Sequence, residues 1–240
     1  MSLGNAGRNM GTSLRWPQWT LVVLIGLLMT CIALCFAIYA WGARFVPDDI
    51  PASSYRASDT IRDQYLAVEA DGATSLRKLN PVTFWIDFFV STRQFLAPPP
   101  AEEILLHRAT QVAQFKHSRA RTQGEHHLAS IALAVKIGRQ WTRDQTVDTI
   151  LAESGFRKDV IGIEAAAEFY FGIPLAELKP QESLALIALL KGPSWFDPFC
   201  YRERFDQRYA QVAGKLGKTG LEWPAAVALS RLRPIKCARR

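Results

Sequence analysis

One uninterrupted apolar run near the N-terminus dominates the hydropathy pattern of the chain. From Trp19 to Trp41 the sequence reads WTLVVLIGLLMTCIALCFAIYAW, without a charged residue. A helix rises about 1.5 Å per residue, so the run can cross a hydrocarbon core about 30 Å thick. Further aromatic residues near its ends, Trp16 and Tyr39, suit the membrane interface. The pattern predicts a transmembrane helix over residues 19–43.

The charges on either side of this run predict its orientation. Arg8 and Arg15 precede it, whereas Asp48 and Asp49 closely follow Arg44. This bias favours a cytoplasmic N-terminal segment and an external location for most of the chain. A cleaved signal peptide is the alternative, but the run is longer than a usual signal core and no clear cleavage site follows it promptly.

The rest of the chain shows helical rather than alternating patterns. Ile61, Tyr65 and Val68 recur at helical spacing. Asn80 is a candidate N-cap before Pro81. We therefore expect an all-α domain behind the single membrane helix. The predicted division of the chain is a cytoplasmic segment 1–18, a transmembrane helix 19–43, a linker 44–56 and a domain 57–240.

Composition adds a charge and a redox argument. The 240 residues carry a formal net charge of +7, which suits anionic partners such as lipid head groups, phosphates or nucleic acid. Two of the four cysteines, Cys31 and Cys35, lie inside the apolar run. The other two, Cys200 and Cys237, can form a disulfide if their compartment is oxidising. The sequence contains no C-x-x-C pair and suggests no zinc site.

The most specific pattern is GIEAAAEFYFGIPLAELKPQESLALIALLKGPSWFDPF, near the C-terminus. It resembles the last motif of the family 51 glycosyltransferases, the peptidoglycan transglycosylases of class A penicillin-binding proteins and monofunctional transglycosylases. Arg208 stands where that family has an arginine after the motif. The matching positions are Gly162, Ile163, Glu164, Ala166, Ala167, Tyr170, Phe171, Gly172, Glu177, Leu178, Glu182, Leu186, Leu189, Pro193 and Pro198.

The N-terminal half resembles the same family less closely. In YLAVEADGATSLRKLNP, Glu69 stands at the catalytic glutamate of the family's first motif, E-D-x-x-F-x-x-H-x-G. The neighbouring motif positions differ, because Ala70 and Leu76 replace the aspartate and the histidine. In the third motif Ser130 stands in place of a second catalytic acid.

The resemblance implies a lysozyme-like helical fold and the transfer of sugar between lipid-linked disaccharide units. A carboxylate removes a proton from the acceptor hydroxyl, which displaces a lipid pyrophosphate from the donor, and cations stabilise the departing group. Glu69 is the expected base. The expected substrate-binding residues are Thr110, Gln111, Lys116, Arg121, His126, His127 and Arg143.

The resemblance also implies partners and leaves one alternative open. The expected partners are the membrane and the lipid-linked precursor or a glycan strand, with no cofactor, although a divalent metal at the pyrophosphate stays open. Because Ser130 cannot act as an acid, the alternative is an inactive relative that binds glycan or a cell-wall synthase as a scaffold. A nucleic-acid-binding module fits the charge alone, since no nucleic-acid motif is present.

Overall fold

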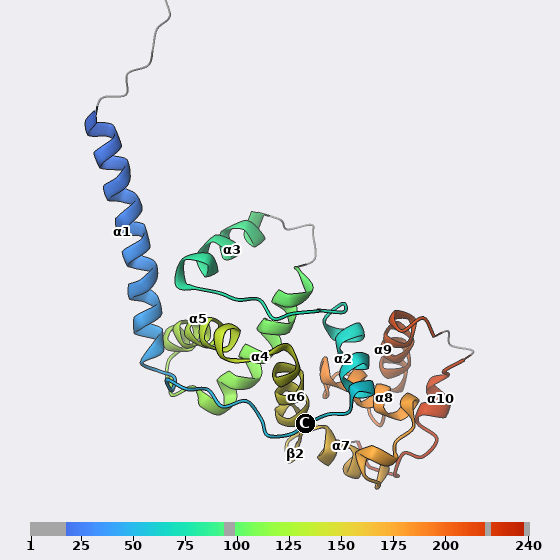
Figure 1. The fold of residues 1–240 in the computed structure, drawn as a ribbon. Coiled ribbons are helices and arrows are strands. Elements are labelled where there is room, and N and C mark those ends of the chain that lie inside the picture. The colour runs from blue at the N-terminus through green and yellow to red at the C-terminus, as the bar shows by residue number, and fades with distance from the viewer. Residues whose placement is uncertain (1–17, 94–98, 219–221, 238–240) are drawn as a thin grey trace, which may run out of the picture.

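The computed structural model of this chain describes residues 18–93, 99–218 and 222–237. The described residues form helices almost throughout, with one short two-stranded sheet (Figure 1). The expectation of an all-α domain behind an apolar N-terminal helix is therefore confirmed. Trp16 and the residues before it lie outside the described ranges.

The secondary-structure elements follow one another along the chain as drawn in Figure 1. They are α1 (Gln18–Ala43), α2 (Asp59–Glu69), α3 (Pro81–Arg93), α4 (Ala101–His117), α5 (Gln123–Gln140), α6 (Arg143–Glu153), β1 (Gly155–Arg157), β2 (Val160–Ile161), α7 (Ile163–Phe171), the 3-10 turn η1 (Leu175–Glu177), α8 (Pro180–Leu190), α9 (Arg202–Lys215) and α10 (Ala225–Ala228).

Local side-chain caps define two of the helix starts, and the sequence predicts the one at Asn80. The Asn80 side chain accepts hydrogen bonds from the backbone N–H groups of Val82 and Thr83, both at 2.9 Å. Thr142 and Gln145 form a reciprocal capping box at the start of α6. Each cap satisfies backbone donors that have no partner within the helix, which fixes where the helix begins.

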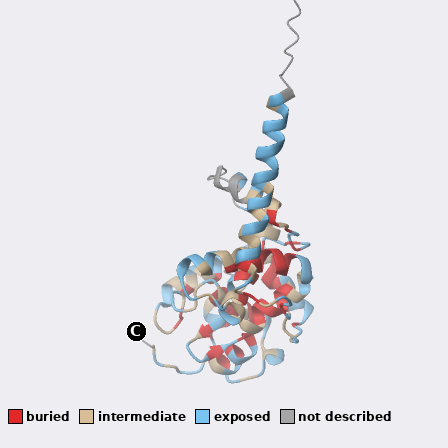
Figure 2. Ribbon diagram, turned by 90° about the vertical axis from the view of Figure 1, so that its left-hand side faces the viewer, coloured by how far each residue is buried: buried red, intermediate tan, exposed pale blue. Residues whose placement is uncertain are grey.

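The core of the domain lies between its helices, below the exposed shaft of α1 (Figure 2). In α7, Ala166, Ala167 and Tyr170 are fully buried, as expected for a packing centre, whereas Ala165 is exposed. Phe171 is also buried. Small side chains on the inner face of α7 let neighbouring helices approach closely, so this part of the family motif is structural.

The domain end of α1 packs directly onto the domain. It contacts α5 and α3. At Gly42 a β-carbon would lie 2.1 Å from the carbonyl oxygen of Leu128, so the crossing requires glycine at that position. The membrane helix is therefore docked on α5 rather than joined to the domain by a free tether.

The segment after α1 is held by hydrogen bonds to α5 and α6. Ile50 is buried, and its backbone accepts from the Trp141 indole at 2.7 Å and donates to the Gln140 side chain at 3.1 Å. Further along, the buried carboxylate of Asp148 accepts from the backbone of Ala57. These contacts join residues about 90 positions apart in the sequence.

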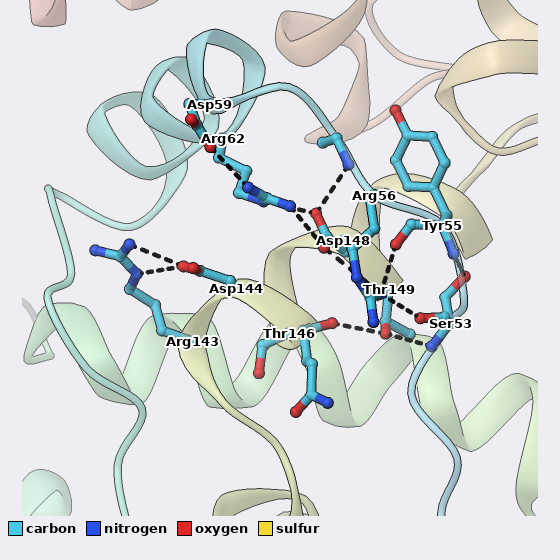
Figure 3. A network of polar contacts seen from close by, with 12 residues as sticks. Ser53, Tyr55, Arg56, Asp59, Arg62, Arg143, Asp144, Thr146, Asp148 and Thr149 are labelled. Carbon is cyan, nitrogen blue, oxygen red and sulfur yellow. Dashed lines mark hydrogen bonds and ion pairs between the residues drawn. The ribbon is translucent and has the colours of Figure 1, made fainter.

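Asp148 is the centre of the polar network in Figure 3. Arg62 donates to both carboxylate oxygens, at 2.8 and 3.0 Å, and Arg56 lies 3.8 Å away. The pKa of Arg62 is raised, chiefly by its hydrogen bond with Asp148. A buried charge needs such a partner, so this network ties the segment after α1 to both α2 and α6.

The C-terminal segment is fastened at three points. Cys200 and Cys237 form a disulfide with their Cα atoms 5.0 Å apart. Arg231 pairs with the buried carboxylate of Glu182 on α8. The N–H of Arg233 donates to the Tyr170 carbonyl at 2.9 Å. The last described residues therefore belong to the folded domain.

Candidate catalytic cleft

Glu69 is the last residue of α2, where the helix ends beside α9. Its carboxylate forms an ion pair with Arg208, and the two side chains are only 5% and 12% exposed. The spacing of Ile61, Tyr65 and Val68 buries one face of α2, which orients its C-terminal turn toward α4 and α9. The residue that the sequence predicts as the base thus lies in a largely buried charged pair.

A cleft of about 540 Å³ opens around this pair. Its lining residues come mainly from α2, α4 and α9, and in the view of Figure 1 α2 is drawn between the other two helices. The ionisable side chains that line the cleft are Glu69, Asp71, Glu103, His107, Arg108, Lys191, Arg208 and Lys215.

Two of the four cations in the cleft are not neutralised by an ion pair. Arg208 is paired with Glu69, and Lys215 is bound to Asp71 at 2.7 Å. Arg108 has only a neutral partner, the Gln111 side chain at 3.3 Å. The side-chain ammonium of Lys191 has no hydrogen-bond or ion-pair partner within the described part of the chain. The cleft can therefore accept an anion without breaking an existing pair.

One face of α4 supplies the polar wall of the cleft. His107 and Arg108 precede Gln111 by four and three residues, so all three lie on the same side of the helix. The Gln111 amide lies 3.1 Å from Nε2 of His107. Burial lowers the pKa of His107, and the charge of Arg108 lowers it further, while Glu103 opposes both. His107 is therefore neutral at pH 7 and can accept or donate a hydrogen bond.

A second pocket, of about 220 Å³, adjoins the cleft beneath α3. Ser130 lines it, together with Phe84 of α3. Glu103 and His107 line both spaces. One continuous surface thus connects Glu69 with Ser130, and its far end lies under the helix that packs beside α1.

The structure brings only part of the predicted site together. Gln111 lines the Glu69 cleft, whereas Thr110 is buried, faces the Ser130 pocket and donates to the Leu106 carbonyl at 2.8 Å. Lys116 forms an ion pair with Glu153. Arg143 binds its neighbour Asp144 at the start of α6.

The remaining predicted residues lie at the junction between α4 and α5. Arg121 and His127 are exposed, and the carbonyl of His126 accepts from the Gln114 amide at 3.0 Å. His126 lines a separate open pocket with the exposed Phe115. Arg121, His126 and His127 are therefore not among the residues that line the Glu69 cleft.

The cleft residues suit an anion better than a divalent metal. Two of its three carboxylates are engaged by cations. Among the residues that the structure describes, no group of three or more His, Cys, Asp or Glu side chains is arranged to hold a metal ion. The described side chains of the cleft therefore offer cations for an anion rather than a set of ligands for a metal ion.

Several cleft residues were missing from the predicted set. His107 and Arg108 carried a detectable signal, because they lie one helical turn before Gln111. Lys191 and Lys215 carried none, because only the packing of α8 and α9 against α2 brings them to Glu69.

Comparison with known proteins matches the later part of the domain, which supplies Gln111, Lys191, Arg208 and Lys215 to the cleft. Residues 109–217 match the family described as Transglycosylase. Penicillin-binding protein 1A of Aquifex aeolicus (strain VF5) is 33% identical over 100 residues, which cover 42% of this chain and 14% of that protein. Penicillin-binding protein 1A of Pseudomonas aeruginosa is 31% identical over 90 residues, 38% of this chain and 11% of that protein.

A third relative shows the same limited coverage. Penicillin-binding protein 1F of Bacillus subtilis (strain 168) is 26% identical over 90 residues, 38% of this chain and 13% of that protein. The chain thus matches only a small fraction of the length of these relatives. Glu69 lies before the matched residues 109–217, so its assignment rests on the N-terminal motif and on the geometry of the cleft.

Proposed function

Because this chain carries a transglycosylase-family domain over residues 109–217, we propose that it acts in peptidoglycan synthesis on a lipid-linked disaccharide precursor. The observation that carries this proposal is the cleft in which Glu69 lies among four cations, two of them free of ion pairs. A carboxylate beside unneutralised positive charge is what sugar transfer from a pyrophosphate donor requires.

The cleft residues have distinct roles in the proposed reaction. The acceptor hydroxyl loses its proton to Glu69 while its oxygen bonds to the anomeric carbon of the donor. The bond between that carbon and the pyrophosphate oxygen breaks, and the two cations without an ion pair, Arg108 and Lys191, bind the departing anion. Arg208 holds the Glu69 carboxylate in an ion pair at the wall of the cleft before the substrate enters.

The position of the domain at the membrane supports a lipid-linked substrate. The apolar helix Trp19–Ala43 anchors the chain, and α3 presents the exposed side chains of Ile86 and Val90 beside it. The Ser130 pocket beneath α3 connects to the Glu69 cleft. A lipid tail in the outer leaflet can therefore lie along α3 while its pyrophosphate reaches the cations.

We place the domain on the extracytoplasmic side of the plasma membrane. The proposed division is a cytoplasmic segment 1–18, a membrane span 19–43, a linker 44–56 and an external domain 57–240. The charges flanking the span favour this orientation. The Cys200–Cys237 disulfide suits an oxidising compartment.

Polymer formation from purified lipid-linked precursor tests catalysis by the full chain. We expect Glu69→Gln to lower the rate about 100-fold or more, because the isosteric amide cannot accept the proton. Asp63→Asn is the matched control, since Asp63 is exposed on the same helix outside the cleft. Undiminished polymer formation by the Glu69→Gln variant would exclude Glu69 as the base.

The second candidate function is binding without transfer, as a scaffold for a glycan strand or a cell-wall synthase. Two observations favour it: Arg208 already occupies the Glu69 carboxylate, and Ser130 supplies no acid in the adjoining pocket. This function predicts that the wild-type chain binds precursor but yields no polymer, and that Glu69→Gln leaves the binding unchanged.

A further inference from the structure

A second cationic pocket lies where α1 meets the domain, and we call it the foot pocket. Its volume is about 540 Å³, and it is open to solvent on one side. It is separate from the Glu69 cleft and shares no lining residue with it. Its lining residues are Ala40, Ala43, Arg44, Val46, Pro47, Asp48 and Arg119.

The foot pocket lies at the depth of the lipid head groups. The apolar span ends at Ala43, and Ala40 is one helical turn inside it. At about 1.5 Å per residue, the pocket therefore begins within the last few ångströms of the hydrocarbon layer and extends outward from it. The exposed Trp41 in the same turn has the amphipathic character typical of this interface.

The packing of α1 fixes the pocket in place. Gly42 lies against the Leu128 backbone, and the N–H of Arg119 donates to the Phe45 carbonyl at 2.8 Å. Arg119 follows α4 in the sequence, whereas Arg44 follows α1. Two arginines from distant parts of the chain thus line the same pocket.

Neither guanidinium in the foot pocket is neutralised. Arg44 and Arg119 are exposed, and their side chains make no hydrogen bond or ion pair within the described residues. The one carboxylate in the lining, Asp48, is engaged by the Lys136 ammonium at 3.2 Å, which also donates to the Pro47 carbonyl. Arginine side chains present several donors in a fixed plane and bind phosphate oxygens well.

We propose that the foot pocket binds the phosphate of an anionic phospholipid head group, with the acyl chains lying along the last turns of α1. The lipid phosphate supplies the anion that the two arginines lack, and the apolar surface beside Ala40 accepts the chains. This inference depends on the membrane anchor alone and does not require sugar transfer. A bound lipid there would hold the Glu69 cleft at a fixed height above the bilayer.

Native mass spectrometry of the full chain in detergent micelles tests the proposal. The probes are phosphatidylglycerol, phosphatidylcholine and inorganic phosphate. We expect the wild-type chain to retain phosphatidylglycerol in preference to phosphatidylcholine. Arg44→Gln and Arg119→Gln should each reduce that retention about fivefold, since a cation near an anionic surface contributes on that scale.

A charge-matched control separates a specific site from general attraction. Lys158→Gln combined with Arg202→Gln also removes two exposed cations, but from outside the foot pocket. This control should retain lipid like the wild type. Without lipid, the control and the Arg44→Gln, Arg119→Gln double variant should both keep the wild-type thermal midpoint. Equal retention by the wild type and by Arg44→Gln combined with Arg119→Gln would overturn the proposal.

The inorganic phosphate arm distinguishes a lipid site from a site for free anions. If the acyl chains contribute to binding, a millimolar excess of inorganic phosphate leaves the retained phosphatidylglycerol unchanged. Complete displacement at that concentration would mean that the pocket binds free phosphate, and would overturn its assignment to lipid.

Discussion

At the scale of single residues, two buried carboxylates differ in what surrounds them. Glu69 and Asp148 are both nearly excluded from solvent, and each has an arginine partner. Their surroundings differ, because Glu69 opens onto a cleft whereas Asp148 is enclosed by backbone and side-chain donors. A buried pair with an open side can exchange its partner for a ligand, and an enclosed pair serves structure.

Asp148→Asn tests the structural role of the enclosed pair. The amide keeps the shape of the side chain but removes the buried counter-ion of Arg62, which keeps only the exposed Asp59 at 2.8 Å. We therefore expect a loss of about 2–4 kcal/mol in the free energy of unfolding. Urea denaturation of the full chain in detergent measures this change. Asp144→Asn, an exposed position on the same helix, should cost less than about 0.5 kcal/mol. Similar losses for both variants would contradict the central role of Asp148.

At the scale of elements, the sequence predicts helices better than it predicts their connections. The caps at Asn80 and Thr142 are local, since each acts within three residues, and the structure has both. Residues 44–56 have no periodic pattern of apolar positions. They are held instead by long-range contacts, such as the hydrogen bond from the Trp141 indole to the Ile50 carbonyl. No local rule could reveal that this segment packs against the domain.

The docking of α1 on α5 is a property of one close helix crossing. Gly42→Val adds a side chain at a position where even a β-carbon would lie 2.1 Å from the Leu128 carbonyl oxygen, so α1 must move away from α5. We expect faster hydrogen–deuterium exchange over residues 44–58 and a cost of about 1–3 kcal/mol.

Gly26→Val is the matched control for this crossing. It makes the same substitution in the same helix, at a position with open space around it. The control should leave exchange over residues 44–58 at the wild-type rate. If Gly42→Val also exchanged at that rate, the anchor would not be held by this contact.

At the scale of the whole molecule, the family assignment and the functional surface come from different parts of the chain. The match covers residues 109–217, whereas Glu69 comes from α2 and reaches the matched part only through tertiary packing. The sequence therefore pointed to Glu69 and Gln111 by motif and spacing. It could not reveal Lys191 and Lys215, because their helices approach α2 only in the folded domain.

We propose that the cations beside Glu69 bind the pyrophosphate of a lipid-linked glycan. The most direct measurement is the dissociation constant of purified precursor for the full chain in detergent. Arg108→Gln combined with Lys191→Gln should weaken binding by about tenfold or more, because charge-assisted hydrogen bonds to the anion are lost. Lys158→Gln combined with Arg202→Gln should bind like the wild type. Absence of binding by the wild type, or equal affinity of all three proteins, would contradict the account.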